Sequence, residues 1–258
     1  MFSFIVIAKD NPAELILTIE SIVNQVDVQM DEIILIDSSS SNAIKNYSQS
    51  LPYPYKSIIK YSHQFPKGVY SAQNTGIKLA SKAFLCVVNS GDYLLPNSRT
   101  YFASCAYKDS NILIHVFAQK FSDENVNFKS TFYPAANTFW PHQSIIYSRC
   151  IHSLIGPYPE IYKFCADQVF FATARQLFPF KIYSFPTSHF NTNGISSGYS
   201  LRYMREIFKV YRLLGRNLFK AFMLAYVLPS VKSFMKPIIP NFILQVLQSF
   251  LSNHRGLL

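Results

Sequence analysis

The sequence predicts an α/β fold in which a doubly wound, right-handed sheet of mainly parallel strands carries helices on its faces. Apolar runs rich in β-branched residues, typical of strands buried on both faces, alternate along the chain with segments of helical periodicity. Strand, helix, strand, helix in this order is typical of parallel sheets with right-handed crossovers. Hydrophobic residues are 49% of the 258 residues and charged residues only 15%, which excludes a disordered chain.

The first strand is expected at 2–8 (FSFIVIA), and a polar turn at 9–12 leads into the first helix. Residues 13–25 form that helix, because Leu15, Ile19 and Ile22 have the spacing of one helix face. The next elements are expected as a second buried strand at 32–36 (EIILI), a shorter strand at 57–61, a helix at 71–80 and a fourth strand at 84–88 (FLCVV).

Acidic residues follow three of these strands: Asp10, Asp37 and Asp92. Ligands of such sheets bind beyond the carboxyl ends of the strands, so these side chains mark the expected site. Neither a GxGxxG nor a GxxxxGK[ST] motif is present, which argues against the usual dinucleotide and P-loop modes. Carboxylates there suit a nucleotide held through its base, its ribose and a divalent cation, Mg²⁺ or Mn²⁺, that bridges its phosphates.

The positive charge is concentrated at the end of the chain. Of the formal net charge of +10, residues 199–258 contribute +8, from nine Lys or Arg and one acid, so residues 1–198 contribute only +2. We therefore expect two parts, a body at 1–198 and a basic helical tail at 199–258. Along 201–222 one helix is expected, with basic residues every three or four positions, at Arg202, Arg205, Lys209, Arg212, Arg216 and Lys220.

A basic amphipathic helix suits the anionic inner surface of a cell membrane, and helices packed on their own domain are the alternative. A spanning helix is not favoured, because the uncharged run at 221–231 has 11 residues where about 20 are needed. The stretch 237–253 includes Asn241, Gln245 and Gln248 and favours a helix in the interface or docked on the body. No signal peptide and no nucleic-acid module are recognised, so a cytoplasmic, peripheral membrane protein that binds no nucleic acid is expected.

Several runs resemble a known family. SFIVIAKDN, SIVNQ and EIILIDSSSSN are similar to the opening of family 2 glycosyltransferases with the GT-A fold. The segments GVYSAQNTGIKLASKAFLCVVNSGDYLLP (68–96) and HQSIIYSRCIHSLIGPYPEIYKFCADQVFF (142–171) resemble the subgroup of bacterial capsule, exopolysaccharide and O-antigen biosynthesis that carries an NSGD motif. The resemblance covers about 3–198 and implies a Rossmann-like mixed sheet flanked by helices.

The resemblance implies an inverting glycosyltransferase of the hexosyltransferase type. It would move a sugar from a nucleotide-diphosphate donor, a UDP-sugar, to a glycan or lipid-linked acceptor in capsule or lipopolysaccharide synthesis. Ser90 replaces the first acid of the metal-binding motif, so Asp92 would hold Mn²⁺ or Mg²⁺ together with His189, for which a loop histidine bonded to the backbone is the alternative. The donor-binding residues implied are Ala8, Asp10, Asp37, Asn74, Ser90, Gly91 and Asp92.

Asp167 stands where the family keeps its general base, which removes the proton of the attacking hydroxyl. An N-terminal helix cap is the alternative role for this residue. Trp140, His142 and Gln143 would line the acceptor side, with Trp140 stacked on a sugar ring or, alternatively, simply part of the core.

Two acids of the subgroup are replaced here, by Pro66 and Ser71, which weakens the expected contacts to uracil and ribose. A second hypothesis therefore stands beside the enzyme: a degenerate, non-catalytic family member that binds nucleotide or acts as an assembly partner. Nucleotide binding that needs Asp92 but gives no transfer would distinguish the two. A homodimer is expected if the tail packs between protomers.

Overall fold

A computed structural model describes residues 1–123, 128–191 and 200–227. The chain divides into two compact units, Met1–Ser197 and Gly198–Leu258. In the described part of the first unit, nine strands form one sheet in the order β3-β2-β1-β4-β8-β6-β9-β5, with β7 paired to β6. The expected mixed sheet flanked by helices is confirmed.

The first half of the sheet is parallel. It consists of β1 (Phe2–Ala8), β2 (Glu32–Asp37), β3 (Ile59–His63) and β4 (Phe84–Asn89), with β1 between β2 and β4. Every residue of β1 and β2 is buried, which explains why these runs read as apolar almost throughout. The carboxyl ends of β1, β2 and β4 consequently meet at one edge of the sheet.

The second half makes the sheet mixed. It consists of β5 (Tyr93–Leu94), β6 (Ile114–Asp123), β7 (Phe128–Phe132), β8 (Ile145–Ser148) and β9 (Phe180–Asn191). Strand β8 is antiparallel to both β4 and β6, whereas β9 is parallel to β6 and antiparallel to β5. Pairing with β5 brings the end of β9 to the edge where β4 ends.

The pairing of β6 with β9 is irregular. Tyr183 lies opposite Phe117, and Ser188 lies opposite Gln119, so five steps along β9 match two steps along β6. Tyr183 stacks on Phe117 at a centroid distance of 4.8 Å, and Ser188 Oγ accepts a hydrogen bond from Gln119 Nε2. The three extra residues of β9 therefore keep the side chains of positions 183 and 188 on the same face of the sheet. In a regular strand, residues five positions apart would point to opposite faces.

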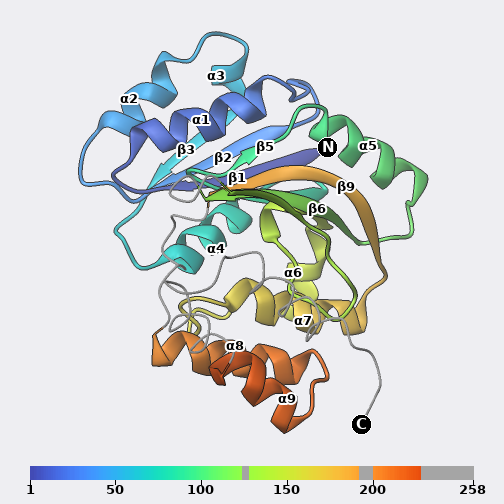
Figure 1. Cartoon of the computed structure of the whole chain (residues 1–258). Coiled ribbons are helices and arrows are strands. Elements are labelled where there is room, and N and C mark those ends of the chain that lie inside the picture. The colour runs from blue at the N-terminus through green and yellow to red at the C-terminus, as the bar shows by residue number, and fades with distance from the viewer. Residues whose placement is uncertain (124–127, 192–199, 228–258) are drawn as a thin grey trace. The chain divides into compact units, whose positions relative to one another are not determined.

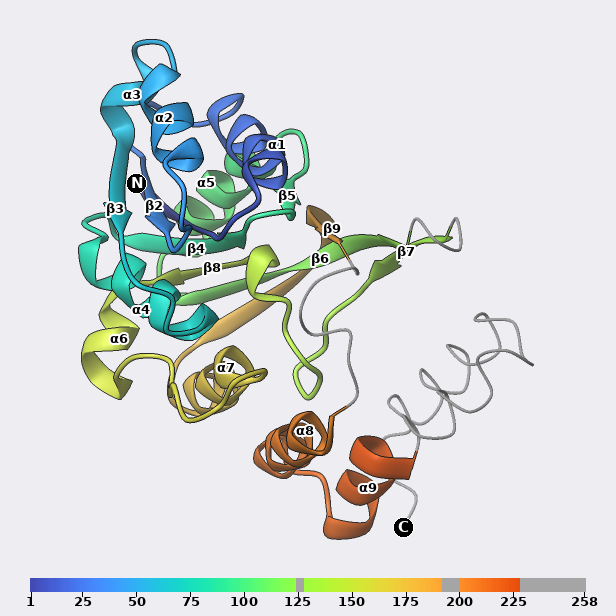
Figure 2. The same cartoon turned by 90° about the vertical axis from the view of Figure 1, so that its left-hand side faces the viewer.

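Helices cover both faces of the sheet (Figures 1 and 2). One face carries α1 (Pro12–Val23), α2 (Ala43–Ser50), α3 (Tyr55–Ile58) and α5 (Ser98–Lys108). The other face carries α4 (Val69–Leu79), α6 (Cys150–Ile155) and α7 (Ala166–Leu177). A short 3-10 turn, η2 (His142–Ser144), precedes β8 and becomes important below.

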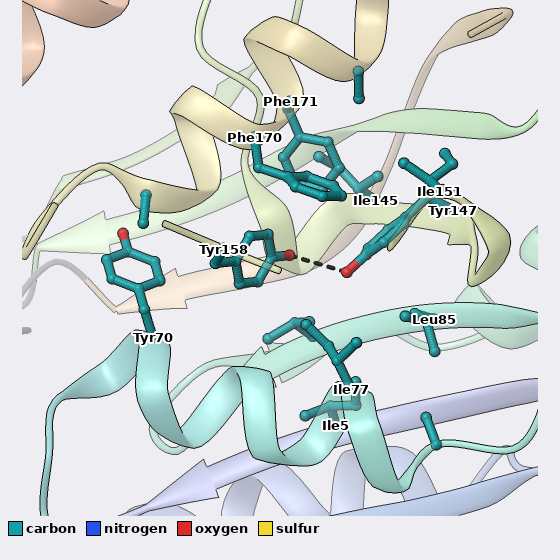
Figure 3. Close-up of a cluster of buried hydrophobic side chains, with 14 of the residues drawn as sticks. Ile5, Tyr70, Ile77, Leu85, Ile145, Tyr147, Ile151, Tyr158, Phe170 and Phe171 are labelled. Atoms are coloured by element: carbon teal, nitrogen blue, oxygen red, sulfur yellow. Dashed lines mark hydrogen bonds between the residues drawn. The ribbon is translucent and has the colours of Figure 1, made fainter. Parts of the chain in front are cut away.

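Strand β1 contributes to the core on each face, as the two-residue period of a strand requires. Phe2, Phe4 and Val6 belong to the core beneath α1 and α5, whereas Ile5 and Ile7 belong to the core beneath α4 and α7. Figure 3 shows the second core, where Tyr70 of α4 points towards α7 and the Tyr158 hydroxyl meets that of Tyr147. This core fixes α4 and α7 against the sheet, and both helices carry residues of the site.

Helix α4 approaches the sheet closely at a glycine. A Cβ added to Gly76 would overlap Cγ2 of Ile5, which is fully buried in β1. The absence of a side chain at this position therefore sets the distance between α4 and β1.

Two predicted elements differ in the structure. The third strand begins at Ile59 rather than at 57, because residues after Pro54 first form the single helical turn α3. The expected helix at 201–222 is wrong as one helix: α8 (Leu201–Leu213) ends at a turn containing Gly215, with φ of +79°, and α9 (Leu218–Phe222) starts after Asn217. Gly after a helix and Asn before one are stop and start signals that outweigh the continuous periodicity.

The second unit continues with a π-helical segment, Met223–Val227. Within the described ranges, none of the helices has both the length and the apolar character to cross a bilayer. The helix expected at 237–253 lies outside the described residues.

Candidate functional site

The loops that follow β1 and β2 are hydrogen-bonded to each other. The Asp10 amide donates to Ser39 Oγ at 2.7 Å, and the Ser40 amide donates to Asp10 Oδ1 at 3.0 Å. The bond from the Ser40 amide is the main cause of a lowered pKa of Asp10. The Ser38 amide donates to the Ala8 carbonyl. The serine run after Asp37 thus joins the two strand ends.

Asp37 is the last residue of β2 and is fully buried. Its Oδ1 accepts from the Ser39 amide at 2.8 Å and its Oδ2 accepts from the Tyr61 hydroxyl at 2.8 Å. Burial, together with the Asp37 carboxylate, raises the pKa of Tyr61 to about 12, so Tyr61 stays a proton donor. Both carboxylate oxygens are therefore engaged within the chain.

The turn that follows β4 is held by a threonine of α1. Gly91, with φ of +95°, donates its amide to Thr18 Oγ1 at 3.0 Å, and Thr18 Oγ1 donates to the Asp92 carbonyl at 2.7 Å. The Ser90 amide bonds the Ile7 carbonyl of β1. These bonds fix residues 89–92 beside the end of β1, so Asp10 and Asp92 belong to the same edge, as predicted.

The Asp92 carboxylate is buried and receives two hydrogen bonds, from Gln143 Nε2 at 2.7 Å and from the Asn191 amide at 3.0 Å. Burial raises the pKa of Asp92 to about 6 in spite of these donors, and the carboxylate of Glu14 contributes in the same direction. Glu14 of α1 lies against the turn, since its Oε2 would be 3.2 Å from a Cβ on Gly91. The two hydrogen bonds do not offset the cost of burying the Asp92 carboxylate, so a cation bound beside it would stabilise its ionised form.

Gln143 has its orientation fixed by a second glutamine. Gln119 Nε2 donates to Gln143 Oε1 at 3.2 Å, so Gln143 must present its Nε2 to Asp92. The same Gln119 nitrogen donates to Ser188 Oγ, whose partner is Ser144 Oγ at 2.5 Å. A buried polar network from β6, β9 and η2 therefore supports Asp92.

Asp167 lies in the first turn of α7 and is 5% exposed. Its Oδ2 accepts from His142 Nδ1 at 2.9 Å and from Gln168 Nε2 at 3.0 Å, and its Oδ1 accepts from the Tyr70 hydroxyl at 2.8 Å. Burial is the largest single influence and raises its pKa, but these donors together lower it below the ordinary value. Cys165, not Asp167, is the N-cap residue of α7.

His142 also contacts the end of β4. Its Nε2 lies 3.1 Å from Asn89 Nδ2, and Asn89 Oδ1 accepts from Gln73 Nε2 of α4 at 2.9 Å. His142 and Gln143, which are adjacent in sequence, thus bind different acids: His142 binds Asp167 and Gln143 binds Asp92. Both were expected on the acceptor side, and the structure brings them between the two carboxylates.

Three other predicted residues have different surroundings. Trp140 is fully buried beneath the Arg175 guanidinium, 3.6 Å from the ring centroid, and its Nε1 donates to the Ala135 carbonyl. A ring without exposed surface has no free face for a sugar, so a supporting role follows. The amide of Asn74 bonds both backbone groups of Tyr158 and so fastens α4 to the following loop. His189 lies opposite Tyr93 and stacks on it at 4.5 Å.

Sequence reasoning missed several residues of this network. Asn89 begins the NSGD segment, and a polar residue ending a buried strand is the signal that could have identified it. The others, Thr18, Gln73, Tyr70 and Gln168, lie on helices, and nothing in their spacing distinguishes them from surface or core positions.

The donor set around Asp92 fits a hard cation. Among the described residues, no three His, Cys, Asp or Glu side chains converge on one point, so the chain offers few ligands of its own. Mg²⁺ and Mn²⁺ accept such sites, because one or two carboxylates are completed by phosphate oxygens and water. Asp92, with Glu14 beside the same turn, provides carboxylates of the required kind.

Comparisons with known proteins identify a family and a fold. Residues 3–178 match the profile of a family described as Glycosyl transferase family 2. No curated protein matches the chain. These residues contain the site from Asp10 to Asp167.

Solved structures share the fold at low sequence identity. The crystal structure of S. aureus TarS has a TM-score of 0.66 at 15% identity, covering 86% of this chain and 43% of that one. TarS 1-349 in complex with UDP-GlcNAc has 0.63 at 17%, covering 83% and 65%. Mannosyltransferase PcManGT from Pyrobaculum calidifontis, in complex with GDP-Man and Mn²⁺, has 0.65 at 10%, covering 98% and 81%. The chain spans less than two thirds of these TarS chains.

Proposed function

The chain belongs to glycosyl transferase family 2, and from this membership we propose that it transfers a hexose from a UDP-sugar to a glycan or lipid-linked acceptor of a bacterial surface polysaccharide. One observation carries the proposal: two buried carboxylates, Asp92 and Asp167, are held in separate environments by the adjacent residues His142 and Gln143. Burial raises the pKa of one, and hydrogen bonds lower the pKa of the other. Such different environments suit two different roles, with Asp92 binding a cation and Asp167 accepting a proton.

The donor belongs at the edge formed by the ends of β1, β2 and β4. In this proposal Asp37 and Asp10 contact the nucleoside and the 89–92 turn meets the diphosphate, since ligands of open α/β sheets bind beyond these strand ends. A UDP-sugar is favoured because TarS, of similar fold, was crystallised with UDP-GlcNAc. The GDP-Man of PcManGT is the alternative to test.

Asp92 holds Mn²⁺ or Mg²⁺ in this proposal, with Glu14 and His189 as the neighbouring side chains able to add a ligand. When bound, the cation supplies positive charge that stabilises the leaving diphosphate. Gln143 and the Asn191 amide orient the Asp92 carboxylate for this role, because each bonds one of its oxygens.

Asp167 is the general base. The acceptor oxygen bonds to the anomeric carbon while its proton passes to Asp167 Oδ1, and the bond from that carbon to the diphosphate breaks with its electron pair left on the diphosphate. Oδ1 receives the proton because it has one donor, Tyr70, whereas Oδ2 already has two. A single displacement inverts the anomeric centre.

The second unit is proposed to bind an anionic membrane surface, which would keep the enzyme near a lipid-linked acceptor. Within this unit, apolar side chains are exposed among basic ones: Phe219 is 74% exposed, and Arg216 and Lys220 lie within three positions of it. Apolar insertion together with basic charge is what peripheral binding needs. The exposed apolar residues are Leu201, Leu213, Leu218, Phe219, Phe222 and Met223.

A thermal-shift screen tests the function. We expect UDP and one UDP-sugar to raise the melting temperature more with Mn²⁺ than without, since a ligand of the folded state stabilises it. Asp92→Ala should remove the metal-dependent part, and Asp27→Ala, at an acid near α1's end, should keep it. Binding by UDP without transfer to any acceptor would favour the non-catalytic alternative. No shift with any nucleotide would contradict the donor site.

A further inference from the structure

Four side chains form a continuous line of hydrogen bonds that crosses the site. Gln73 of α4 binds Asn89 at the end of β4, Asn89 binds His142 of η2, and His142 binds Asp167 of α7. The line therefore joins the first residue of the donor-side turn to the base. Each link is between 2.9 and 3.1 Å.

One end of the line gives the orientation of the Asn89 amide in the structure. Gln73 Nε2 donates to Asn89 Oδ1, while Gln73 Oε1 is buried without a hydrogen-bond partner. Asn89 Nδ2 is then the atom that faces His142 Nε2, and it can only donate. His142 Nε2 must consequently be the unprotonated, accepting nitrogen.

The other end of the line fixes the proton on Nδ1. Asp167 is ionised, since its pKa lies below the ordinary value, and its Oδ2 can only accept. His142 Nδ1 must therefore carry the proton. Together the two ends assign one neutral tautomer: Asp167 requires hydrogen on Nδ1, and Asn89 Nδ2 requires a lone pair on Nε2.

We propose that His142 is a positioning residue locked in this tautomer by Asn89, and that the lock leaves Asp167 Oδ1 as the only oxygen open to the substrate's proton. This inference rests on the proposed function. It specifies which oxygen of the base accepts the proton, and it connects the base to the turn that contains Asp92. His142 itself accepts no substrate proton, because its one lone pair is occupied by Asn89 Nδ2.

The ionisable groups around His142 come from three elements. Asp167 of α7 bonds it directly, Tyr70 of α4 bonds the same carboxylate, and Asp92 after β4 interacts with it electrostatically. Burial keeps the pKa of Tyr70 well above its ordinary value, so Tyr70 remains a donor and does not compete for the proton.

Nitrogen NMR of the imidazole tests the tautomer without any activity assay. In the ¹⁵N-labelled full chain near neutral pH, we expect a protonated Nδ1 and an unprotonated Nε2 for His142, assigned by the loss of its signals in His142→Gln. An imidazolium, or a proton on Nε2 alone, would overturn the proposal. This readout is independent of whether the chain transfers sugar, so the two proposals fail separately.

Asn89→Asp tests the lock. It exchanges the donor facing Nε2 for an acceptor, so His142 should become protonated on both nitrogens between two carboxylates. Asn74→Asp is the matched control, because Asn74 lies on α4 and bonds the backbone of Tyr158 instead. An unchanged His142 spectrum in folded Asn89→Asp would refute the role of Asn89.

Kinetics test the positioning role. His142→Asn keeps an N–H close to the position of Nδ1, whereas His142→Leu removes it. We expect kcat to fall about a hundredfold in His142→Leu, with the donor KM little changed, and to recover about tenfold or more in His142→Asn. Equal losses in the two variants would count against the hydrogen bond, and a loss confined to KM would count against the base.

Discussion

Gln143 Nε2 lies 2.7 Å from Asp92 Oδ2, at the point where the donor's diphosphate is proposed to bind. The preceding residue, His142, bonds the other acid of the site. One short turn thus fixes both carboxylates, and each of its side chains can be removed separately.

Gln143→Leu should weaken nucleotide binding. Loss of its N–H leaves the buried Asp92 carboxylate with one donor, which raises the pKa of Asp92 further and disfavours the ionised form that binds a cation. Supporting residues of this kind are typically worth about 10- to 100-fold in metal affinity. Calorimetric titration of UDP with Mn²⁺ would measure the change. Gln176→Leu, at an exposed glutamine of α7, should leave the affinity unaltered.

Asp167→Asn should abolish transfer while donor binding persists. The amide cannot take the acceptor's proton, and its NH₂ would face a donor, either His142 or Tyr70. Loss of a general base typically costs about 10² to 10⁴ in rate. Transfer assays beside UDP titration separate the two effects, with Asp27→Asn as control. Transfer at the unmodified rate would show that another group removes the proton.

Acid should destabilise the fold through two buried histidines. Burial lowers the pKa of His115 and of His152 from 6.5 to about 4, so the unfolded chain binds protons first. Each histidine therefore contributes up to about 3 kcal/mol that is present above pH 6.5 and lost as the pH falls through 4. Asp92, whose pKa is raised to about 6, has the opposite effect on the free energy of unfolding, which it increases as the pH falls. It is a single group, so the two histidines outweigh it.

Denaturant unfolding between pH 7.5 and 5 would measure this loss. In His152→Gln, whose side chain does not titrate, the free energy of unfolding should fall less steeply with decreasing pH. Identical slopes in the two proteins would show that His152 does not contribute.

Gly76→Ala should destabilise the protein although alanine is the better helix former. The added Cβ overlaps Ile5 Cγ2, and this side chain cannot move away because it is fully buried where β1 packs against α4. Overpacking of this kind typically costs about 1–3 kcal/mol in the free energy of unfolding. Thr75→Ala, one position earlier, should change it by less than about 0.5 kcal/mol. Urea unfolding of both variants decides the point.

Binding to anionic vesicles should depend on exposed apolar residues of the second unit. The full chain with Leu218→Asp and Phe219→Asp loses two side chains, 67% and 74% exposed, and places two negative charges beside a negative surface. In a flotation assay its bound fraction should drop several-fold. Tyr107→Asp, at an 86% exposed residue of the first unit, should bind as before. Equal binding by all three would exclude the proposed membrane surface.

The strands buried on both faces could be predicted from sequence because their environment dictates their composition. Every residue of β1 and β2 is buried, so the runs 2–8 and 32–36 are apolar almost throughout. An acidic residue follows each run and marks where the strand ends. The same reasoning placed Asp10, Asp37 and Asp92 at one edge of the sheet. Local patterns suffice where the surroundings of each residue are uniform.

The partners of those acids could not be predicted, since they depend on contacts between distant segments. Asp92 and Gln143 are 51 positions apart, and Tyr70 and Asp167 are 97 apart. Trp140 shows the same limit, because only the fold reveals that Arg175 covers its ring. The break between α8 and α9 is different, because the sequence contains its signals. Gly215 and Asn217 are typical of a helix end and a helix start, but the continuous spacing of the basic residues favoured a single helix.

The irregular pairing of β9 has a consequence for how this segment can vary. The number of residues at 184–187 returns the strand to β6 with Ser188 beside Gln119, and Phe185 and Thr187 within this segment are packed inside the fold. Deletion of one residue would turn Ser188 outward and withdraw the Asn191 amide from Asp92. Related chains that keep this site should therefore agree in the length of this segment, so that insertions and deletions are absent from it.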